Sequence, residues 1–232
     1  MNNREIDELL SSANVLPAPA QRLQQIESAI LGDLKPVDPL GPAGLYRAAF
    51  VFTFVAVCAI ACYIVGANGW YALGPLQKSV IFLPLAVSVV WGATSLALQM
   101  RPAAKHVRST ALVSTGLFVA VVLIMAMVFQ PEQESDFVRH GLACFRTGMA
   151  FGIPAAVLFA LLLRRGAILS PGFTGATAGG LAGLVGLTVL EIHCPNLNVY
   201  HIVVWHVSVT VVCIILGFIF SSVTFSRWRS NP

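Results

Sequence analysis

The chain has 232 residues, of which 57% are hydrophobic and only 10% are charged. Because a soluble domain carries about 25% charged residues, this composition excludes an ordinary soluble protein and indicates a membrane protein. The net charge of +4 comes from lysines and arginines near the apolar runs, so it does not indicate direct binding to nucleic acid.

Residues 1–44 form the only sizeable segment outside the predicted membrane spans. Apolar residues at helical spacing predict two short amphipathic helices, and three prolines in residues 36–42 then predict a semi-extended spacer. Two such helices cannot build a core alone. They are either a disordered or surface-lying tail, or a docking element that folds onto a partner protein. The acidic first helix favours a protein partner over anionic lipid. The candidate docking residues are Ile6, Leu9, Leu10, Leu23, Ile26 and Ile30.

Six apolar runs follow, and each is long enough to cross the hydrocarbon core of a bilayer. They cover approximately residues 45–65, 80–98, 111–129, 143–163, 173–190 and 200–221. Because backbone groups in lipid must be paired within the protein, these runs should be helices. The sequence therefore predicts an all-α polytopic membrane protein. Its parts would be an N-terminal segment (1–44), a six-transmembrane-helix bundle (45–221) and a short C-terminal tail (222–232).

The flanking charges predict how the bundle is oriented. No basic region followed by a short apolar stretch opens the chain, so we expect no cleaved signal peptide. Lysines and arginines gather before the first span, between the second and third, and after the fourth and sixth, whereas the alternate loops hold Lys78 and Arg139. This bias predicts that both termini are cytoplasmic. In the fifth span, Gly175, Gly179 and Gly183 at spacing four predict close packing within the bundle.

Two hairpins bring cysteines and histidines to the same non-cytoplasmic edge. The loop 130–142 contains His140 and leads to Cys144, and the loop 191–199 contains His193 and Cys194. Three interpretations stay open on these residues alone: a disulfide between the two cysteines, coordination of a soft metal ion, or two buried cysteines that only pack. The remaining cysteines lie inside spans, where we interpret them as packing residues.

Other chemistry is disfavoured by the placement of the polar residues. His201 and His206 are five residues apart, about 140° around an α-helix, so they should not share a face, and a bis-histidine haem site is not expected. His206 is instead predicted to hydrogen-bond a neighbouring helix, and Glu191 could pair with Arg146. No Asp, Glu or Lys lies at mid-span, which disfavours an ion-coupled transporter. No catalytic set or cofactor fingerprint is visible, so we do not expect an enzyme.

Residues 141–216 contain two specific motifs, "CFRTG" at Cys144–Gly148 and "HCP" at His193–Pro195. In these motifs the chain resembles the negative regulator of sigma F (NrsF) family of six-span bacterial membrane proteins. It departs from the family at His206, where a tyrosine often follows the tryptophan, so no family role is carried over to that residue.

The resemblance implies an anti-sigma factor of the bacterial inner membrane. Residues 1–36 would hold an extracytoplasmic-function (ECF) sigma factor, and Cys144 and Cys194 would be the signal-sensing pair, for a redox or a metal signal. His140 and His193 are further candidates for this site. No cofactor is expected beyond a transient soft metal ion at the cysteines. The alternatives are a small integral-membrane redox or haem protein, and a transporter.

Overall fold

The computed structural model of the chain describes residues 24–25, 27–28, 40–101, 107–131 and 135–229. The chain forms two compact units, residues 1–39 and residues 40–232. The predicted docking residues of the first unit lie outside the described residues; they are Ile6, Leu9, Leu10, Leu23, Ile26 and Ile30.

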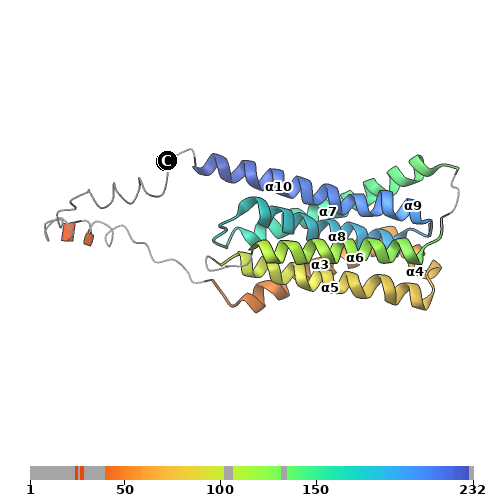
Figure 1. The fold of residues 1–232 in the computed structure, drawn as a ribbon, viewed down its shortest axis with the longest axis horizontal. Coiled ribbons are helices and arrows are strands. Elements are labelled where there is room, and N and C mark those ends of the chain that lie inside the picture. The colour runs from red at the N-terminus through yellow and green to blue at the C-terminus, as the bar shows by residue number, and fades with distance from the viewer. Residues whose placement is uncertain (1–23, 26, 29–39, 102–106, 132–134, 230–232) are drawn as a thin grey trace, which may run out of the picture. The chain divides into compact units, whose positions relative to one another are not determined.

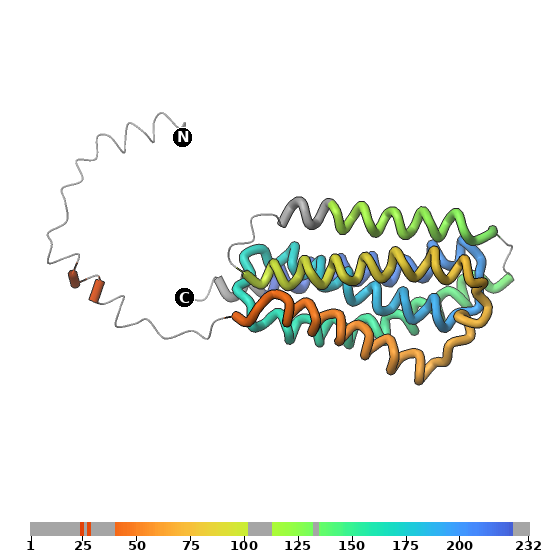
Figure 2. The backbone as a smooth tube through the Cα atoms, turned by 90° about the horizontal axis from the view of Figure 1, so that it is seen from below, coloured from red at the N-terminus to blue at the C-terminus, as the bar shows by residue number. Residues whose placement is uncertain are grey.

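The second unit is a bundle of long helices that run side by side (Figures 1 and 2). Its elements in chain order are α3 (Ala43–Val65), α4 (Asn68–Ala72), α5 (Pro75–Gln99), α6 (Val107–Val128), α7 (Phe137–Leu163), α8 (Pro171–His193), α9 (Val199–His201), the π-helix η1 (Ile202–His206) and α10 (Val207–Arg229). Among the described residues there is no strand, and Gln130 and Asn198 form an isolated bridge. The predicted all-α polytopic fold is confirmed.

Five of the helices within the described residues are long and apolar enough to cross a membrane. They are α3, α5, α7, α8 and the continuous run from α9 through α10; α6 contributes a shorter apolar stretch, Val113–Val128. Helix α7 begins at Phe137, well before residue 143, and α10 continues past residue 221 to Arg229. The difference arises because intrahelical hydrogen bonds continue through polar residues, whereas an apolar run ends at them.

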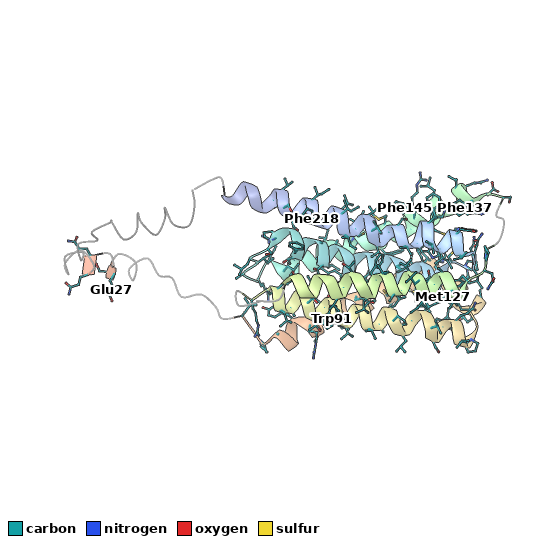
Figure 3. All side chains as sticks on the ribbon, viewed as in Figure 1. Glu27, Trp91, Met127, Phe137, Phe145 and Phe218 are labelled. Atoms are coloured by element: carbon teal, nitrogen blue, oxygen red, sulfur yellow. The ribbon has the colours of Figure 1, made fainter. Side chains whose placement is uncertain are left out.

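Large apolar side chains cover the outside of the bundle, as a protein surrounded by lipid requires. Met127 on α6 is 79% exposed and Phe218 on α10 is 46% exposed; both residues are labelled in Figure 3. A soluble protein would bury such residues against a core.

Helix α8 is the central helix of the bundle, because 78% of its apolar window is buried, a far larger share than in any of the other four candidate spans. Its glycines explain how α10 approaches it so closely. A Cβ atom added at Gly179 would overlap the carbonyl of Cys213, and one at Gly183 would overlap the backbone of Thr210. The prediction that these glycines serve packing within the bundle is confirmed. The other helices therefore pack around α8, and the candidate site lies at its C-terminal end.

Candidate functional site

The site lies at the end of the bundle where α7 begins and α8 ends. Cys144 lies in the second turn of α7, and Cys194 directly follows α8. The residue before a proline avoids the helical region, and Cys194, which precedes Pro195, is extended, with φ −80° and ψ 118°. Its N–H still donates to the carbonyl of Leu190, at 2.7 Å. The "HCP" motif thus ends the helix and holds the thiol at its end.

Two glycines of α7, one before and one after Cys144 in the sequence, allow this helix to approach its neighbours closely. At Gly141 an added Cβ would overlap the indole of Trp205, and at Gly148 it would lie 2.8 Å from Val209 and 2.9 Å from Leu190. Gly148 is the last residue of the "CFRTG" motif. Part of that motif therefore serves close packing, which brings Cys144 near α8 and η1.

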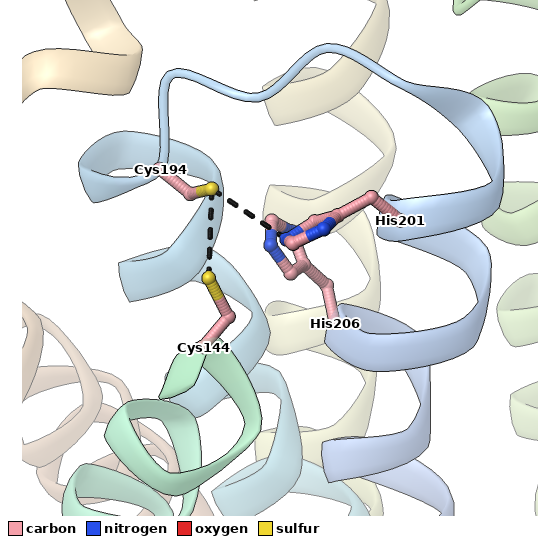
Figure 4. Close-up of side chains that lie close together, drawn as sticks. All are labelled: Cys144, Cys194, His201 and His206. Carbon is pink, nitrogen blue, oxygen red and sulfur yellow. Dashed lines mark hydrogen bonds between the residues drawn. The ribbon is translucent and has the colours of Figure 1, made fainter. Parts of the chain in front are cut away.

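The two cysteine sulfur atoms lie 3.6 Å apart (Figure 4). The two thiols are not joined by a disulfide, whose S–S bond is about 2.05 Å long. Cys194 is buried and Cys144 is partly buried. The structure thus brings together the two cysteines that the sequence singled out.

A π-helical turn adds two histidines to these sulfur atoms. The Asn198 side chain accepts a hydrogen bond from the Tyr200 N–H at 3.0 Å, which caps α9. In the π-helix η1, the N–H of Val207 donates to the carbonyl of Ile202, five residues earlier. This i→i+5 bonding brings residues five apart to one face.

The rings of His201 and His206 are therefore neighbours, with centroids 5.2 Å apart and planes at 86°. The prediction that they do not share a face is wrong, because it assumed α-helical geometry.

Four side chains form one group, which we call the Cys2His2 cluster: Cys144, Cys194, His201 and His206. One side-chain donor atom from each lies within 4.8 Å of the others. The Nε2 atom of His201 lies 3.8 Å from the Cys194 sulfur. Figure 4 shows both imidazoles directed toward the cysteines from one side. This set of donors is suited to a soft metal ion, and the sulfur pair is also suited to reversible oxidation.

Glu191 supports the cluster from the last turns of α8. Its Oε1 lies 2.8 Å from His206 Nδ1, and both side chains are almost fully buried, at 3% and 1% exposure. The prediction that His206 hydrogen-bonds a neighbouring helix is confirmed. The partner that was predicted for Glu191, Arg146, is exposed instead. The buried Nε2 of His206 has no hydrogen-bond partner.

The neighbours of Cys194, which lies in the loop after α8, lower the pKa of its thiol. The Cys144 S–H donates to the Cys194 sulfur, and this contributes most; His201 and His206 act in the same direction, and burial opposes them. The thiolate is the form of cysteine that binds metals and attacks electrophiles. The cluster therefore favours the reactive form of Cys194.

The histidines that the sequence favoured, His140 and His193, lie outside the Cys2His2 cluster. His140 is exposed and His193 is half-buried. Adjacency to a cysteine in the sequence did not identify the histidines of this group, since His193 directly precedes Cys194 and yet is not among the four residues. The five-residue spacing of His201 and His206 was the useful signal, because short π-turns occur frequently at functional sites.

The backbone beside Cys194 contacts the end of the α3–α4 segment. A Cβ at Gly69 in α4 would overlap the carbonyls of Cys194 and Glu191. At the opposite end of the bundle, Arg101 Nη2 donates to the carbonyl of Gly41 at 3.2 Å, just before α3 begins. Helix α3 therefore connects the cluster end of the bundle with the end at which residues 1–39 join it.

A comparison with protein families matches residues 31–228 to the family described as negative regulator of sigma F, NrsF. Comparisons with curated proteins and with solved structures found no match. The match covers most of the chain, including both cysteine-containing hairpins and all the long helices. The chain therefore belongs to the NrsF family of negative regulators of a sigma factor.

Proposed function

We propose that the protein is a membrane-embedded anti-sigma factor for an ECF sigma factor. In this proposal, residues 1–36 hold the sigma factor at the cytoplasmic face of the inner membrane. A redox or metal signal at Cys144 and Cys194, on the other face of the membrane, lowers the affinity of residues 1–36 for the sigma factor. The family match over residues 31–228 is the observation that carries the proposal.

The orientation follows from the bias of lysine and arginine among the loops. Because the Cys2His2 cluster and the start of α3 lie at opposite ends of the bundle, a cytoplasmic N-terminal segment puts the cluster outside the cytoplasm. Thiols there meet oxidants and metal ions that the reducing cytoplasm would intercept.

Either signal would change the distance between α7 and the end of α8. In oxidation by a peroxide, the thiols of Cys144 and Cys194 give up two electrons and two protons, an S–S bond forms, and the peroxide is reduced to water. The sulfur atoms would then move from 3.6 Å to about 2.05 Å. A soft metal ion would instead displace the thiol protons and hold the two sulfur atoms at separate coordination positions.

The contact of Gly69 with the backbone of Cys194 and Glu191 supplies a route for this change. Movement of the Cys194 loop would press on α4 and hence on α3, which leads directly to residues 1–39. A signal can shift such an equilibrium only through its different affinity for the two states of the bundle. The extent to which the signal releases the sigma factor would thus measure how much more tightly the signal binds one state of the bundle than the other.

The test is co-purification of the sigma factor with the detergent-solubilised protein. The full-length chain should retain a sigma factor, identified by mass spectrometry, and a chain lacking residues 1–36 should lose it. Treatment with peroxide or a soft metal ion should release the sigma factor from the full-length chain. The C144S and C194S variants should retain it.

Two results would contradict the proposal in separable ways. A sigma factor bound equally without residues 1–36 would rule out docking through this segment. Release from the cysteine variants as readily as from the unaltered chain would rule out sensing through the cysteines.

A further inference from the structure

We propose that Cys144, Cys194, His201 and His206 form a single four-donor site for a divalent d10 cation of the Zn²⁺ class, and that Glu191 positions His206 as a donor. The sensing role of this site rests on the function proposed above. In that role, the signal would be the binding of a metal ion. Metal binding itself can be measured without the sigma factor.

The first support is the geometry of the donor atoms. Zn²⁺ binds sulfur at about 2.3 Å and imidazole nitrogen at about 2.0–2.1 Å in a tetrahedral arrangement, which places its donors about 3.3–3.8 Å apart. The two cysteine sulfurs are 3.6 Å apart, and Cys194 Sγ is 3.8 Å from His201 Nε2. All four donors lie within 4.8 Å of one another, so their widest separation exceeds the tetrahedral spacing by about 1 Å.

The second support is the state of His206, whose two ring nitrogens have different surroundings. Nδ1 contacts the Glu191 carboxylate at 2.8 Å, so it carries the proton. In the tautomer that a metal ion would select, Nε2 has the lone pair; it is buried and makes no hydrogen bond of normal length, and its ring interacts electrostatically with Cys194. An unpaired buried acceptor is costly for a folded protein. Coordination of a cation by Nε2 would remove that cost.

Glu191 fits the role of the carboxylate that orients a metal-binding histidine. Such histidines usually donate their second ring N–H to a carboxylate, a carbonyl or a water, which fixes the tautomer and makes the ligand more basic. The contact joins the last turns of α8 to η1. It therefore fixes His206 relative to Cys194, which follows the same end of α8.

A disulfide alone does not account for these residues. It would use the two sulfur atoms and leave unexplained the π-turn that brings His201 and His206 together and the carboxylate that orients His206. Packing of inert cysteines leaves the same features unexplained. Two thiolates balance the charge of one divalent cation, and two neutral imidazoles complete the usual Cys2His2 set of structural zinc sites.

The experiment is a titration of the metal-free, reduced full-length protein in detergent with Co²⁺, a spectroscopic substitute for Zn²⁺. We expect one Co²⁺ per chain, with thiolate-to-cobalt charge-transfer bands and tetrahedral d–d bands, and we expect Zn²⁺ to displace it. C144S and C194S should lose the charge-transfer bands. H201Q and H206Q should change the d–d bands and weaken binding.

Glu191 is tested with E191Q, which keeps the size of the side chain. We expect binding to weaken about 10- to 100-fold while one Co²⁺ is still bound per chain. The matched control is H193Q, next to Cys194 but outside the cluster, which should bind as the unaltered chain does. Circular dichroism and size-exclusion profiles equal to those of the unaltered chain establish that each variant is folded.

Three outcomes would overturn the inference: Co²⁺ bound without thiolate bands, H201Q and H206Q binding like the unaltered chain, or H193Q weakening binding as much as H206Q. Different results would contradict the proposed metal site and the proposed function. Normal Co²⁺ spectra with no sigma factor retained contradict the function and leave the site. A retained sigma factor with no Co²⁺ bands contradicts the site and leaves the function.

Discussion

Among single residues, Cys194 has surroundings that favour its thiolate form. It lies at the end of α8, its sulfur accepts a hydrogen bond from Cys144 at 3.6 Å, and His201 lies 3.8 Å away. Together these neighbours outweigh the effect of burial and lower the pKa of its thiol. An unperturbed cysteine has a pKa of about 8.5, so Cys194 should keep its thiolate at lower pH than an isolated thiol does.

This lowered pKa can be tested by alkylation with iodoacetamide between pH 5 and pH 9. We expect the alkylation rate of Cys194 in the metal-free protein to rise with a midpoint below that of an ordinary thiol. In C144A the main hydrogen-bond donor is gone, so the midpoint should move to higher pH. The rates are followed by mass spectrometry of the Cys194 peptide. Coinciding midpoints near the ordinary value in both proteins would contradict this account.

At the scale of the elements, the π-turn η1 creates the histidine pair. In an α-helix His201 and His206 would point about 140° apart, whereas the i→i+5 hydrogen bond from Val207 to Ile202 places their rings side by side. The turn leads directly into α10, which packs along the glycines of α8. The position of the histidines therefore depends on the α8–α10 interface.

The α8–α10 interface can be tested with two glycine substitutions of opposite expected effect. Gly179→Ala places a methyl group against the Cys213 carbonyl, and we expect it to destabilise the bundle by about 1–3 kcal/mol. Gly116→Ala in α6 is the control, since no atom lies within 4 Å of the added Cβ. It should be neutral or stabilise by up to about 1 kcal/mol.

Thermal unfolding of both variants in detergent, followed by circular dichroism, measures the difference. A G179A midpoint equal to that of G116A would mean that α10 moves away from α8 without cost.

At the scale of the whole molecule, the bundle separates two ends with different chemistry. One end carries the Cys2His2 cluster, and at the other Arg101 contacts Gly41 where α3 begins. A signal that passes between these ends has to travel the length of the helices. The proposed function therefore requires that the two ends face opposite sides of the membrane.

The orientation can be tested with alkaline phosphatase fusions, which are active only outside the cytoplasm. A fusion after residue 134, in the loop before α7, should be active, and a fusion after residue 104 should be inactive, because lysine and arginine gather in the cytoplasmic loops. Immunoblots control for the amount of each fusion. The reverse pattern would place the cluster in the cytoplasm and contradict the proposed direction of signalling.

Much of this architecture could be predicted because it depends on local composition. The apolar runs indicate helices wherever they occur, and the spacing of the glycines in the fifth run indicates a packing face. The meeting of Cys144 and Cys194 at one edge could be anticipated once the spans were counted, since alternate loops lie on the same side. The docking role of residues 1–36 is still a prediction.

The helical class, the long apolar runs and the meeting of the two cysteines could be read from the order of the residues, because hydropathy and chain direction are properties of that order. Which other side chains join the two cysteines could be seen only in the folded bundle. It replaced His140 and His193 with His201 and His206, and it paired Glu191 with His206 rather than Arg146. The physical reason is that these contacts join different helices, and one π-turn changes the direction of a side chain in a way that residue spacing does not reveal.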